Sequence, residues 1–307
     1  MKKDLSVVVV NYNTGGFLAK AVESVVNSDL AGISWEIVVV DNASFDESID
    51  DLRKLYSDIG KKQLVLVENK ENLGFARANN VGIKNTSGEL VLFLNPDTTL
   101  EKSSLKQAVS FMRSREDAGA VAINMRLPSG EMDEAMHRGF PTPWNAFCFF
   151  SGLARLFPQS RWFSGYVLGW KLKDKSPHEI EAGSGAFMLV RWKAGEEVGW
   201  WDEDYYWNGE DVDFYYRLNK AGWKSYFLPE ACGIHYRGVS SGVKEYSRKI
   251  SKASRETRIR AATASCDAMI VFYRKHYLSK SWDLVTRLVF LGISLLRIVR
   301  LMKAKWF

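Results

Sequence analysis

Strand-like runs and helix-like segments alternate through the first 125 residues of this 307-residue chain. The strand-like runs are continuously apolar and rich in β-branched residues: Leu5–Val10, Trp35–Val40, Gln63–Val67, Leu90–Leu94 and Gly119–Ile123. Segments with apolar residues at helical spacing lie between them: Phe17–Val26, Ile49–Tyr56, Ala76–Ile83 and Leu105–Met112. Unbroken apolar runs are typical of strands covered on both faces. The pattern predicts an α/β fold with a mostly parallel central sheet, flanking helices and right-handed crossovers.

The alternation breaks down between Arg126 and Ile180, where five of the seven prolines lie. This stretch is rich in aromatic residues: Phe140, Trp144, Phe147, Phe149, Phe150, Trp162, Phe163 and Trp170. Two interpretations stay open, namely an irregular insert that packs its aromatics into a core and a mobile loop beside a ligand. Regular elements are predicted again further on: a strand at Ala186–Val190, a helix at Val212–Leu218, a strand at Ser225–Phe227 and helices beyond Tyr246.

The charge of the chain is unevenly distributed. The net charge is +6, but the segment from Ser247 onward holds 14 Lys and Arg residues against three acids. The remainder, Met1–Tyr246, therefore carries a net charge of −5. A general nucleic-acid binder presents positive charge along its recognition face, so we expect no nucleic-acid partner. An acidic body with a basic end instead predicts a folded domain that is held to an anionic surface by its C-terminal part.

Cysteine usage and the N-terminus indicate the compartment. Cys148, Cys232 and Cys266 lie far apart with no C-x-x-C pair, which excludes a disulfide framework and a thiolate zinc site. The apolar run near the N-terminus is four valines long, whereas a secretory signal needs about 7–15 apolar residues. These features predict a cytoplasmic protein.

Polar residues collect where three of the predicted strands end. Asn11-Tyr12-Asn13 follows the first strand, Asp41-Asn42-Ala43-Ser44 the second, and Asn95-Pro96-Asp97 the fourth. Each group could be an ordinary turn. Three groups at the carboxyl ends of neighbouring strands instead favour a ligand site, because open α/β sheets bind ligands there. No G-x-G-x-x-G follows the first strand, which makes a dinucleotide-dependent dehydrogenase an unfavoured interpretation.

Six segments resemble, in order, those of family-two glycosyltransferases. On the donor side they are Val9–Asn13, Val40–Asp46, Asn72–Asn80 and Phe93–Asp97, and on the acceptor side Trp201–Glu203 and Glu210–Asp213, followed by His235. The resemblance covers about residues 5–240 and is closest to a rhamnosyltransferase-like branch. It implies a GT-A-like domain at 1–240, with a donor half at 1–125 and an acceptor half at 126–240. A helical, membrane-associating tail would occupy 241–307.

The resemblance assigns donor contacts to a set of polar residues. Asp41 would accept hydrogen bonds from the base or ribose, and Tyr12 is placed to stack on the base. Gly74 would let the backbone approach the ligand closely. Asn72 and Asn79 would offer amide contacts that add no negative charge near the diphosphate, and Asn11, Asn13 and Asn95 are also expected to contact the donor.

The segment Asn95-Pro96-Asp97 resembles the metal-binding D-x-D position of the family. Asp97 is then the carboxylate ligand of a divalent cation, Mg²⁺ or Mn²⁺, which prefers oxygen ligands. Asn95 replaces the first acid of the motif, which predicts weaker metal affinity and a contact of Asn95 with the ribose or a metal-bound water. His235 could join the metal or the diphosphate, or be a packed histidine.

Three acids lie within four residues at the start of a predicted helix, and one matches the catalytic acid of the family. Asp211 would be the base that takes the proton from the acceptor hydroxyl, and Glu210 would orient the acceptor. Asp213 could be structural. A carboxylate at this position is also favourable for helix capping and for the helix dipole.

The segment Trp282–Phe307 predicts a basic amphipathic helix. Nine uncharged residues separate Arg287 from Arg297, fewer than the roughly 20 of a transmembrane helix. The apolar residues share one third of a helical projection: Leu284, Leu288, Leu291, Leu295, Ile298, Val299, Met302 and Trp306. The basic residues lie opposite or near the border, and others could extend their face: Arg287, Arg297, Arg300, Lys303 and Lys305, then Arg255, Arg258 and Arg260. In-plane membrane attachment is the favoured interpretation, and docking on the catalytic domain or a second subunit is the alternative.

The resemblance implies an inverting, metal-dependent glycosyltransferase in cell-surface polysaccharide synthesis. The donor would be a nucleoside-diphosphate sugar, dTDP-rhamnose or a UDP-sugar. The acceptor would be a hydroxyl of a glycan or a polyprenyl-diphosphate-linked oligosaccharide, on the inner face of the cell membrane. Association into a homo-oligomer stays open. The alternatives are a catalytically silent sugar-nucleotide-binding protein and a nucleotidyltransferase, although the latter usually has a basic residue in a glycine-rich loop after the first strand.

Overall fold

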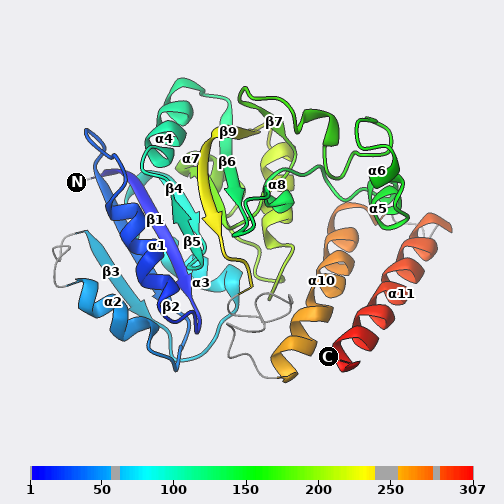
Figure 1. Ribbon diagram of the computed structural model, residues 1–307, viewed down its shortest axis with the longest axis horizontal. Helices are drawn as coiled ribbons and strands as arrows, with labels where there is room; N and C mark the ends of the chain where they lie inside the picture. The colour runs from blue at the N-terminus through cyan, green and yellow to red at the C-terminus, as the bar shows by residue number, and fades with distance from the viewer. Residues whose placement is uncertain (1, 57–62, 239–254, 279–283, 307) are drawn as a thin grey trace.

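The computed structural model describes residues 2–56, 63–238, 255–278 and 284–306 (Figure 1). Its core is a nine-stranded sheet in the order β3-β2-β1-β4-β8-β6-β9-β5, with β7 paired to β9. The strands are β1 (Lys3–Asn11), β2 (Trp35–Asp41), β3 (Leu64–Glu68), β4 (Gly88–Leu94), β5 (Thr98–Leu100), β6 (Ala118–Arg126), β7 (His178–Ile180), β8 (Phe187–Arg191) and β9 (Lys224–His235). The long helices are α1 (Phe17–Val26), α2 (Ser48–Tyr56), α3 (Phe75–Ile83), α4 (Ser104–Ser114), α8 (Glu210–Lys220), α10 (Arg255–His276) and α11 (Leu284–Trp306).

The N-terminal half of the sheet has the predicted parallel arrangement. β1 pairs in parallel with β2 and β4, and β2 pairs in parallel with β3. The α/β fold is therefore confirmed, with each predicted strand and helix of the first 125 residues present. Parallel pairing brings the carboxyl ends of β1, β2 and β4 to one edge, with Asn11 directly beside Asp41.

The other half of the sheet is mixed. β8 runs antiparallel to both β4 and β6, and β9 pairs in parallel with β6 but antiparallel with β5 and β7. Three-residue strands such as β5 and β7 carry too few residues to show an apolar pattern, and the sequence did not predict them. β5 nevertheless matters, because its pairing places Thr98 opposite His235.

Helices cover both faces of the sheet, as the continuously apolar strands require. Leu5, Val7 and Val9 of β1 belong to a core with α1, α2 and α4, whereas Val8 belongs to a core with α3, α8 and α10. The short helix α7 (Trp192–Glu197) lies on the second face too. Successive residues of β1 thus contact opposite layers, which explains why a polar alternation is missing from this strand.

The predicted irregular stretch contains short helices rather than a bare loop. α5 (Pro143–Phe150) and α6 (Leu153–Leu156) lie within it, together with two single turns at Glu134–Met136 and Gly169–Lys171. Thr142 caps α5 by accepting a hydrogen bond from the Asn145 backbone N–H, and Pro143 occupies its first turn, a favourable start for a helix. Most of the aromatics of α5 are exposed, so the packed-core interpretation does not describe them.

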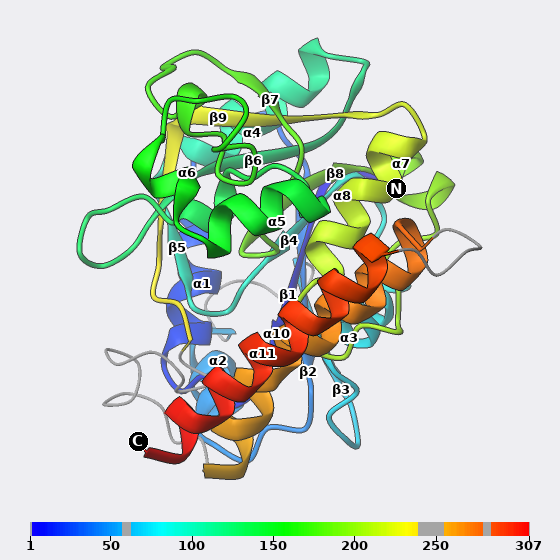
Figure 2. The same cartoon turned by 90° about the vertical axis from the view of Figure 1, so that its right-hand side faces the viewer.

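The C-terminal helices form an antiparallel pair beside the sheet domain (Figure 2). α10 packs against α8 through Ala268 and Phe272, which share the buried core of the second face. α11 packs on α10. Within the described residues, every helix is too short or too polar to cross a membrane. The side chains of Arg255, Arg258, Arg260, Lys303, Lys305 and Trp306, named in the tail prediction, lie outside the described residues.

Candidate active site

Asn11 and Asp41 form a buried hydrogen-bonded pair at the ends of β1 and β2. The Asn11 amide Nδ2 donates to Asp41 Oδ1 at 2.9 Å and to the hydroxyls of Ser44 and Ser48 at 3.0 and 2.8 Å. Asp41 Oδ2 in turn accepts the backbone N–H of Ser44 at 3.0 Å. These contacts fix the loop after β2. Asn11 holds the loop in place, and the loop in turn orients the Asp41 carboxylate.

Tyr12 and Asn13 lie at the rim of this loop. The Asn13 backbone N–H donates to Ser44 Oγ at 3.0 Å, and Asn13 Oδ1 accepts the Phe45 N–H at 2.9 Å. The half-buried Tyr12 ring meets the exposed Phe45 ring edge-on, with 6.4 Å between centroids. Tyr12 and Phe45 therefore present two aromatic side chains at the edge where a base was predicted to stack. Nothing in the sequence marked Phe45 for this position.

Asn42 organises the next loop, which carries the predicted residues Asn72 and Gly74. Its Nδ2 donates to Asn72 Oδ1 at 2.8 Å, and its Oδ1 accepts the Leu73 N–H at 3.0 Å. Gly74 has φ +82°, and a Cβ there would lie 2.9 Å from the backbone oxygen of Tyr206. The Tyr206 backbone thus approaches position 74 so closely that a glycine is required there. Asn72 holds the loop in which this approach occurs.

Asn79 lies inside α3, away from the rim. Only 1% of it is exposed, and its Nδ2 donates to the Phe75 carbonyl one turn earlier at 3.0 Å. Its neighbour Asn80 instead donates to the Trp201 carbonyl at 2.9 Å and accepts the Trp201 N–H at 3.2 Å. The asparagines of this helix therefore bind backbone of their own helix and of the acceptor half, and a donor contact of Asn79 stays a prediction.

Asp97, which follows β4, lies beside His235, the last residue of β9. His235 Nε2 lies 3.4 Å from Asp97 Oδ1, and both side chains are nearly buried. On the other side of the ring, His235 Nδ1 lies 2.8 Å from Oδ2 of the fully buried Asp133, whose second oxygen accepts from Arg237 at 3.0 Å. Asp133 comes from the irregular stretch, and nothing in the local sequence marks it.

The carboxylates determine the proton affinity of this histidine. Burial by itself lowers the pKa of His235, but the charge of Asp97 and the hydrogen bond to Asp133 raise it to about 9. Burial disfavours the charged form of Asp133 as well, yet the hydrogen bond from His235 and the charge of Arg237 lower its pKa to about 2. Asp97, His235, Asp133 and Arg237 therefore form a row of side chains whose charges alternate in sign.

The Asp97–His235 pair fits a divalent cation with few protein ligands. A ligating histidine usually donates its other ring N–H to a carboxylate, which is the relation of His235 to Asp133. Magnesium is commonly held by one or two carboxylates together with substrate phosphates. The part of the chain that the structure describes holds no group of three His, Cys, Asp or Glu side chains placed for a metal. Asn95 lies two residues before Asp97, with its backbone N–H bonded to the Ala186 carbonyl at 3.1 Å.

Asp211 and Glu210 begin α8 in a partly enclosed position. Asp211 Oδ2 accepts from Arg138 at 3.0 Å, and the two side chains are 14% and 15% exposed. Glu210 is 8% exposed, and its Oε2 has no hydrogen-bond partner in the described residues. Burial, reinforced by the negative charge of Asp211, raises the pKa of Glu210 to about 8. One acid is thus paired and the other is held protonated near neutral pH.

Asp213, the third acid, is fully buried and structural in its contacts. It binds Arg217 Nε at 2.6 Å and His276 Nε2 of α10 at 2.7 Å, and Tyr205 donates to it at 3.3 Å. A Cβ on Gly209, just before Glu210, would lie 2.8 Å from Ala268 Cβ of α10. The acids of α8 are therefore supported from behind by α10, which the sequence assigned to the tail.

One short segment connects the two halves of the site. Arg138, the partner of Asp211, also donates to the Gly183 carbonyl at 2.5 Å. Three residues further on, the Ala186 carbonyl accepts the Asn95 N–H. Three residues of chain span at most about 11 Å. The segment 183–186 therefore brings the ends of β4 and α8 to the same edge of the sheet.

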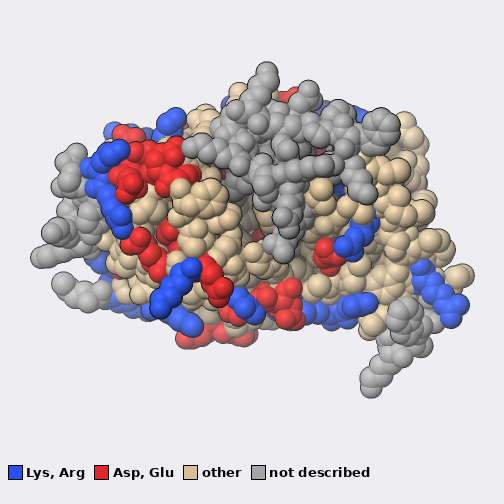
Figure 3. Space-filling model, turned by 90° about the horizontal axis from the view of Figure 1, so that it is seen from below, with Lys and Arg blue, Asp and Glu red and all other residues tan. Residues whose placement is uncertain are grey.

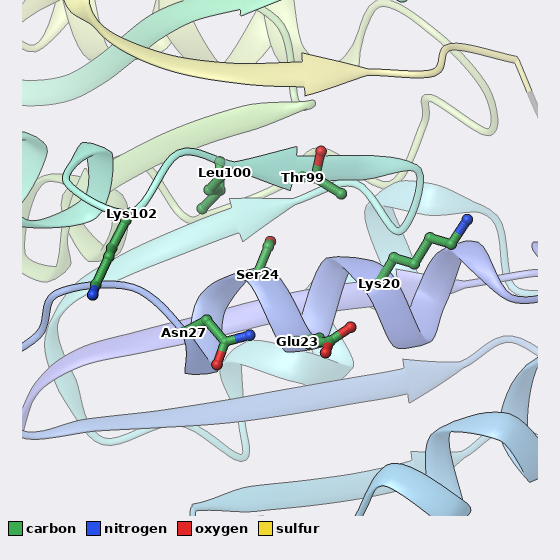
Figure 4. A pocket seen from close by; sticks show the side chains of 7 residues that line it. All are labelled: Lys20, Glu23, Ser24, Asn27, Thr99, Leu100 and Lys102. Atoms are coloured by element: carbon green, nitrogen blue, oxygen red, sulfur yellow. The ribbon is translucent and has the colours of Figure 1, made fainter.

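A shallow groove elsewhere on the molecule holds none of these residues. It lies between α1 and β5 and is lined by Lys20, Glu23, Ser24, Asn27, Thr99, Leu100 and Lys102 (Figure 4). Its side chains show no convergence of buried polar groups comparable with the strand-end site. We therefore place the candidate active site at the edge formed by β1, β2, β4 and α8.

The chain matches two family models, Glycosyl transferase family 2 over residues 6–167 and Glycosyl transferase family group 2 over residues 90–304. The chain belongs to glycosyl transferase family 2 and is a glycosyltransferase. The first match contains the loops of Asn11, Asp41, Gly74 and Asp97, and the second adds the acids of α8.

Two curated relatives are rhamnosyltransferases. The N-acetylglucosaminyl-diphospho-decaprenol L-rhamnosyltransferase of Mycobacterium tuberculosis is 27% identical over 257 residues, 78% of each chain. Rhamnosyltransferase WbbL of Escherichia coli is 25% identical over 172 residues, 53% of this chain and 61% of WbbL. The mannosyltransferase PcManGT from Pyrobaculum calidifontis, solved with GDP-Man and Mn²⁺, superposes with a TM-score of 0.59 at 17% identity, over 99% of this chain and 74% of that one. That likeness establishes the shared fold.

Proposed function

We propose that this glycosyltransferase transfers a sugar with inversion from a nucleoside-diphosphate donor to a hydroxyl of a lipid-linked glycan. dTDP-rhamnose is the leading donor, because the two curated relatives named above are rhamnosyltransferases. A UDP-sugar is the second candidate. The name of the relative from M. tuberculosis specifies an acceptor that is linked to a polyprenol through a diphosphate. We extend that class of acceptor to this chain.

The observation that carries the proposal is the convergence of two acidic groups on one edge. Asp97 with His235 lies beyond β4, and Asp211 with Glu210 begins α8, with the segment 183–186 contacting both sides. A divalent cation held by Asp97 and His235 would neutralise the charge that develops on the departing diphosphate. Asp41 would accept hydrogen bonds from the nucleoside, and Tyr12 and Phe45 would bound the base.

Asp211 is the proposed base on the acceptor side. Its ion pair with Arg138 holds the carboxylate in one orientation, so that an oxygen can receive the proton of the incoming hydroxyl. Glu210, protonated near neutral pH, can donate a hydrogen bond to an acceptor oxygen. In an inverting displacement the acceptor hydroxyl attacks the anomeric carbon from the face opposite the departing diphosphate, and Asp211 would take the proton of that hydroxyl.

We also propose that the protein works in the cytoplasm, attached to the inner membrane face through α11. A lipid-linked acceptor lies in that membrane, and α11 presents apolar side chains to the outside. This placement would confine the enzyme to the surface that carries its substrate.

Replacing the base tests the assignment of Asp211. Asp211→Asn keeps the shape and loses proton acceptance, so we expect kcat to fall by about 10²–10⁴-fold with donor affinity nearly unchanged. Donor affinity is measured by calorimetry across dTDP- and UDP-sugars with and without Mn²⁺, and turnover with a lipid-linked acceptor.

Asp204→Asn, at an exposed carboxylate, is the matched control. Unchanged turnover in Asp211→Asn would show that Asp211 is not the base. Release of pyrophosphate from nucleoside triphosphates would point to a nucleotidyltransferase instead.

A further inference from the structure

α11 packs on α10 through a mixed side, on which Thr286 and Ile293 are buried and Phe290 packs on Tyr273, and it turns a second, apolar side outward. Arg297 binds Asp267 of α10 at 2.8 Å, and Arg300 also reaches α10, at Ser265. The opposite side is a stripe of six exposed side chains, each 52–71% exposed, which we name the α11 apolar stripe: Leu284, Leu288, Leu291, Leu295, Ile298 and Met302. A surface helix of a globular protein normally buries such a stripe. This arrangement leaves it without a partner in the described chain.

A second apolar surface lies on α5, α6 and the turn that follows them. Six of its large side chains are 48–79% exposed, and we name them the α5–α6 aromatic patch: Trp144, Phe147, Phe150, Leu156, Phe157 and Trp162. The patch is held together at its base, because Phe163 packs against both Trp144 and Phe157 with centroids 6.2 and 5.3 Å apart. Contiguous exposed aromatics of this kind mark interaction surfaces.

The two surfaces lie on the same side of the molecule. α5, α6 and α11 are at the right-hand side in Figure 1, and all three are turned toward the viewer in Figure 2. Both views therefore place the helices that carry the patch and the stripe on the same side of the molecule, away from β2 and β3.

Both surfaces lie on stretches of chain that hold basic residues and no acidic one; on α11 Arg287 is exposed, whereas Arg297 and Arg300 bind α10. The sequence from Ala135 to Lys173, which contains the patch, has no acidic residue but has Arg155, Arg161 and Lys173, all exposed. α11 has no acidic residue either. Viewed from below, the right-hand end of the molecule shows only basic and uncharged side chains beyond the central acidic groups (Figure 3). An apolar surface bordered by positive charge is complementary to anionic lipid, and it disfavours pairing with a second copy of itself.

We propose that the α5–α6 aromatic patch is a second membrane-contact surface, which binds an anionic phospholipid bilayer together with the α11 apolar stripe. Tryptophan and phenylalanine favour the lipid–water boundary, and the flanking basic residues would meet the headgroups. The patch belongs to the same stretch of chain as Arg138, the partner of Asp211. The inference rests on the proposed function for the identity of the membrane, and it ties the acceptor side of the site to the bilayer at two points.

Vesicle co-sedimentation of the full-length protein tests this inference. Vesicles of phosphatidylglycerol and phosphatidylethanolamine are compared with vesicles of phosphatidylcholine, without donor or acceptor. We expect wild type to bind the anionic vesicles at least 10-fold more tightly. The triple variant Phe147→Gln/Phe150→Gln/Trp162→Gln should lose about 10-fold in anionic-vesicle affinity, as should Leu288→Gln/Leu291→Gln/Leu295→Gln. The matched control Val65→Gln, an exposed apolar residue of β3, should bind as wild type does.

Two results would overturn the inference. Either the patch variant binds vesicles as tightly as wild type, or wild type sediments as a dimer that the patch substitutions dissociate and binds no vesicles. Circular dichroism and donor calorimetry on each variant show that it is folded. Asp211→Asn should keep full vesicle affinity, so failure of sugar transfer and failure of membrane contact give different results.

Discussion

Asp133 is a positioning residue for His235. It is fully buried, it binds Nδ1 of the ring, and it leaves Nε2 directed at Asp97. Loss of such a carboxylate behind a ligating histidine typically lowers metal affinity by about 10–100-fold. We expect Asp133→Asn to weaken the Mn²⁺-dependent part of donor binding by that factor, as measured by calorimetry.

Donor affinity in the presence of EDTA should stay the same in wild type and Asp133→Asn, since the proposed nucleoside contacts are elsewhere. Asp174→Asn, an exposed carboxylate 3.9 Å from His178, serves as control. Equal loss with and without Mn²⁺ would show that Asp133 supports the fold rather than a metal ligand.

Glu210 makes the stability of the protein depend on pH. Its pKa of about 8, raised by burial and by Asp211, lies above the ordinary value of 4.5. Between these two values the folded protein holds a proton that the unfolded chain has released. The free energy of unfolding therefore falls by a few kcal/mol as the pH rises from about 4.5 to 8.

Glu210→Gln cannot ionise and should remove this fall. Urea denaturation at about pH 5 and about pH 9 is the measurement, and the variant should gain stability relative to wild type at the higher pH. Glu196→Gln, an exposed glutamate, should follow wild type at both values. Parallel curves for wild type and Glu210→Gln would contradict a protonated, buried Glu210.

At the scale of elements, the loop between β3 and α3 depends on Gly74. Its φ of +82° is costly for any side chain, and a Cβ would also meet the Tyr206 carbonyl at 2.9 Å. Gly130 has a similar φ of +87° with no atom within 4 Å of a built Cβ, so it isolates the backbone cost.

We expect Gly130→Ala to cost about 1–2 kcal/mol and Gly74→Ala about 1–3 kcal/mol more, in the free energy of unfolding. Donor affinity should fall in Gly74→Ala and stay unchanged in Gly130→Ala. Of these two glycines, only Gly74 lies in the loop that Asn42 and Asn72 hold. Equal destabilisation by the two substitutions would show that Tyr206 moves aside at no cost.

The sequence predicted elements well where the apolar pattern was long. α1 has the predicted bounds, and β2 and β4 differ by one or two residues, because unbroken apolar runs and helical spacing are local signals. β5 and β7 escaped prediction because three residues give no period. Their placement depends on β9, more than 40 residues away.

The residues of the candidate site also divide into those with a local sequence signal and those placed only by long-range contacts. Strand-end residues such as Asp41 and Asp97 could be located from the sequence, since parallel strands bring their carboxyl ends together. Asp133 and Arg138 could not, because each acts through a contact with a residue over 70 positions away, His235 and Asp211. Long-range pairing leaves no local pattern, so these two partners emerged only from the fold.

At the scale of the whole molecule, α10 shares a buried core with α8 and the sheet. Phe272 is 4% exposed and packs on Tyr216 of α8 with 5.4 Å between centroids, and His276 binds Asp213. The boundary predicted at 240 therefore separates segments of sequence that share one buried cluster.

We expect Phe272→Ala to lower the free energy of unfolding by about 3–5 kcal/mol in a single cooperative transition. Leu288→Ala, on the exposed stripe of α11, should change it by less than about 0.5 kcal/mol. Calorimetry that shows two separate transitions, with only the smaller one shifted, would mean that α10 folds independently of the sheet.

The segment 183–186 has a consequence for how this enzyme can change its substrates. At one end the Ala186 carbonyl accepts the backbone N–H of Asn95. At the other end the Gly183 carbonyl accepts from the guanidinium of Arg138, the partner of Asp211. On the proposed function, this segment would hold the two sides of the site at one spacing. A change of donor sugar would then come from exchanging side chains on this frame.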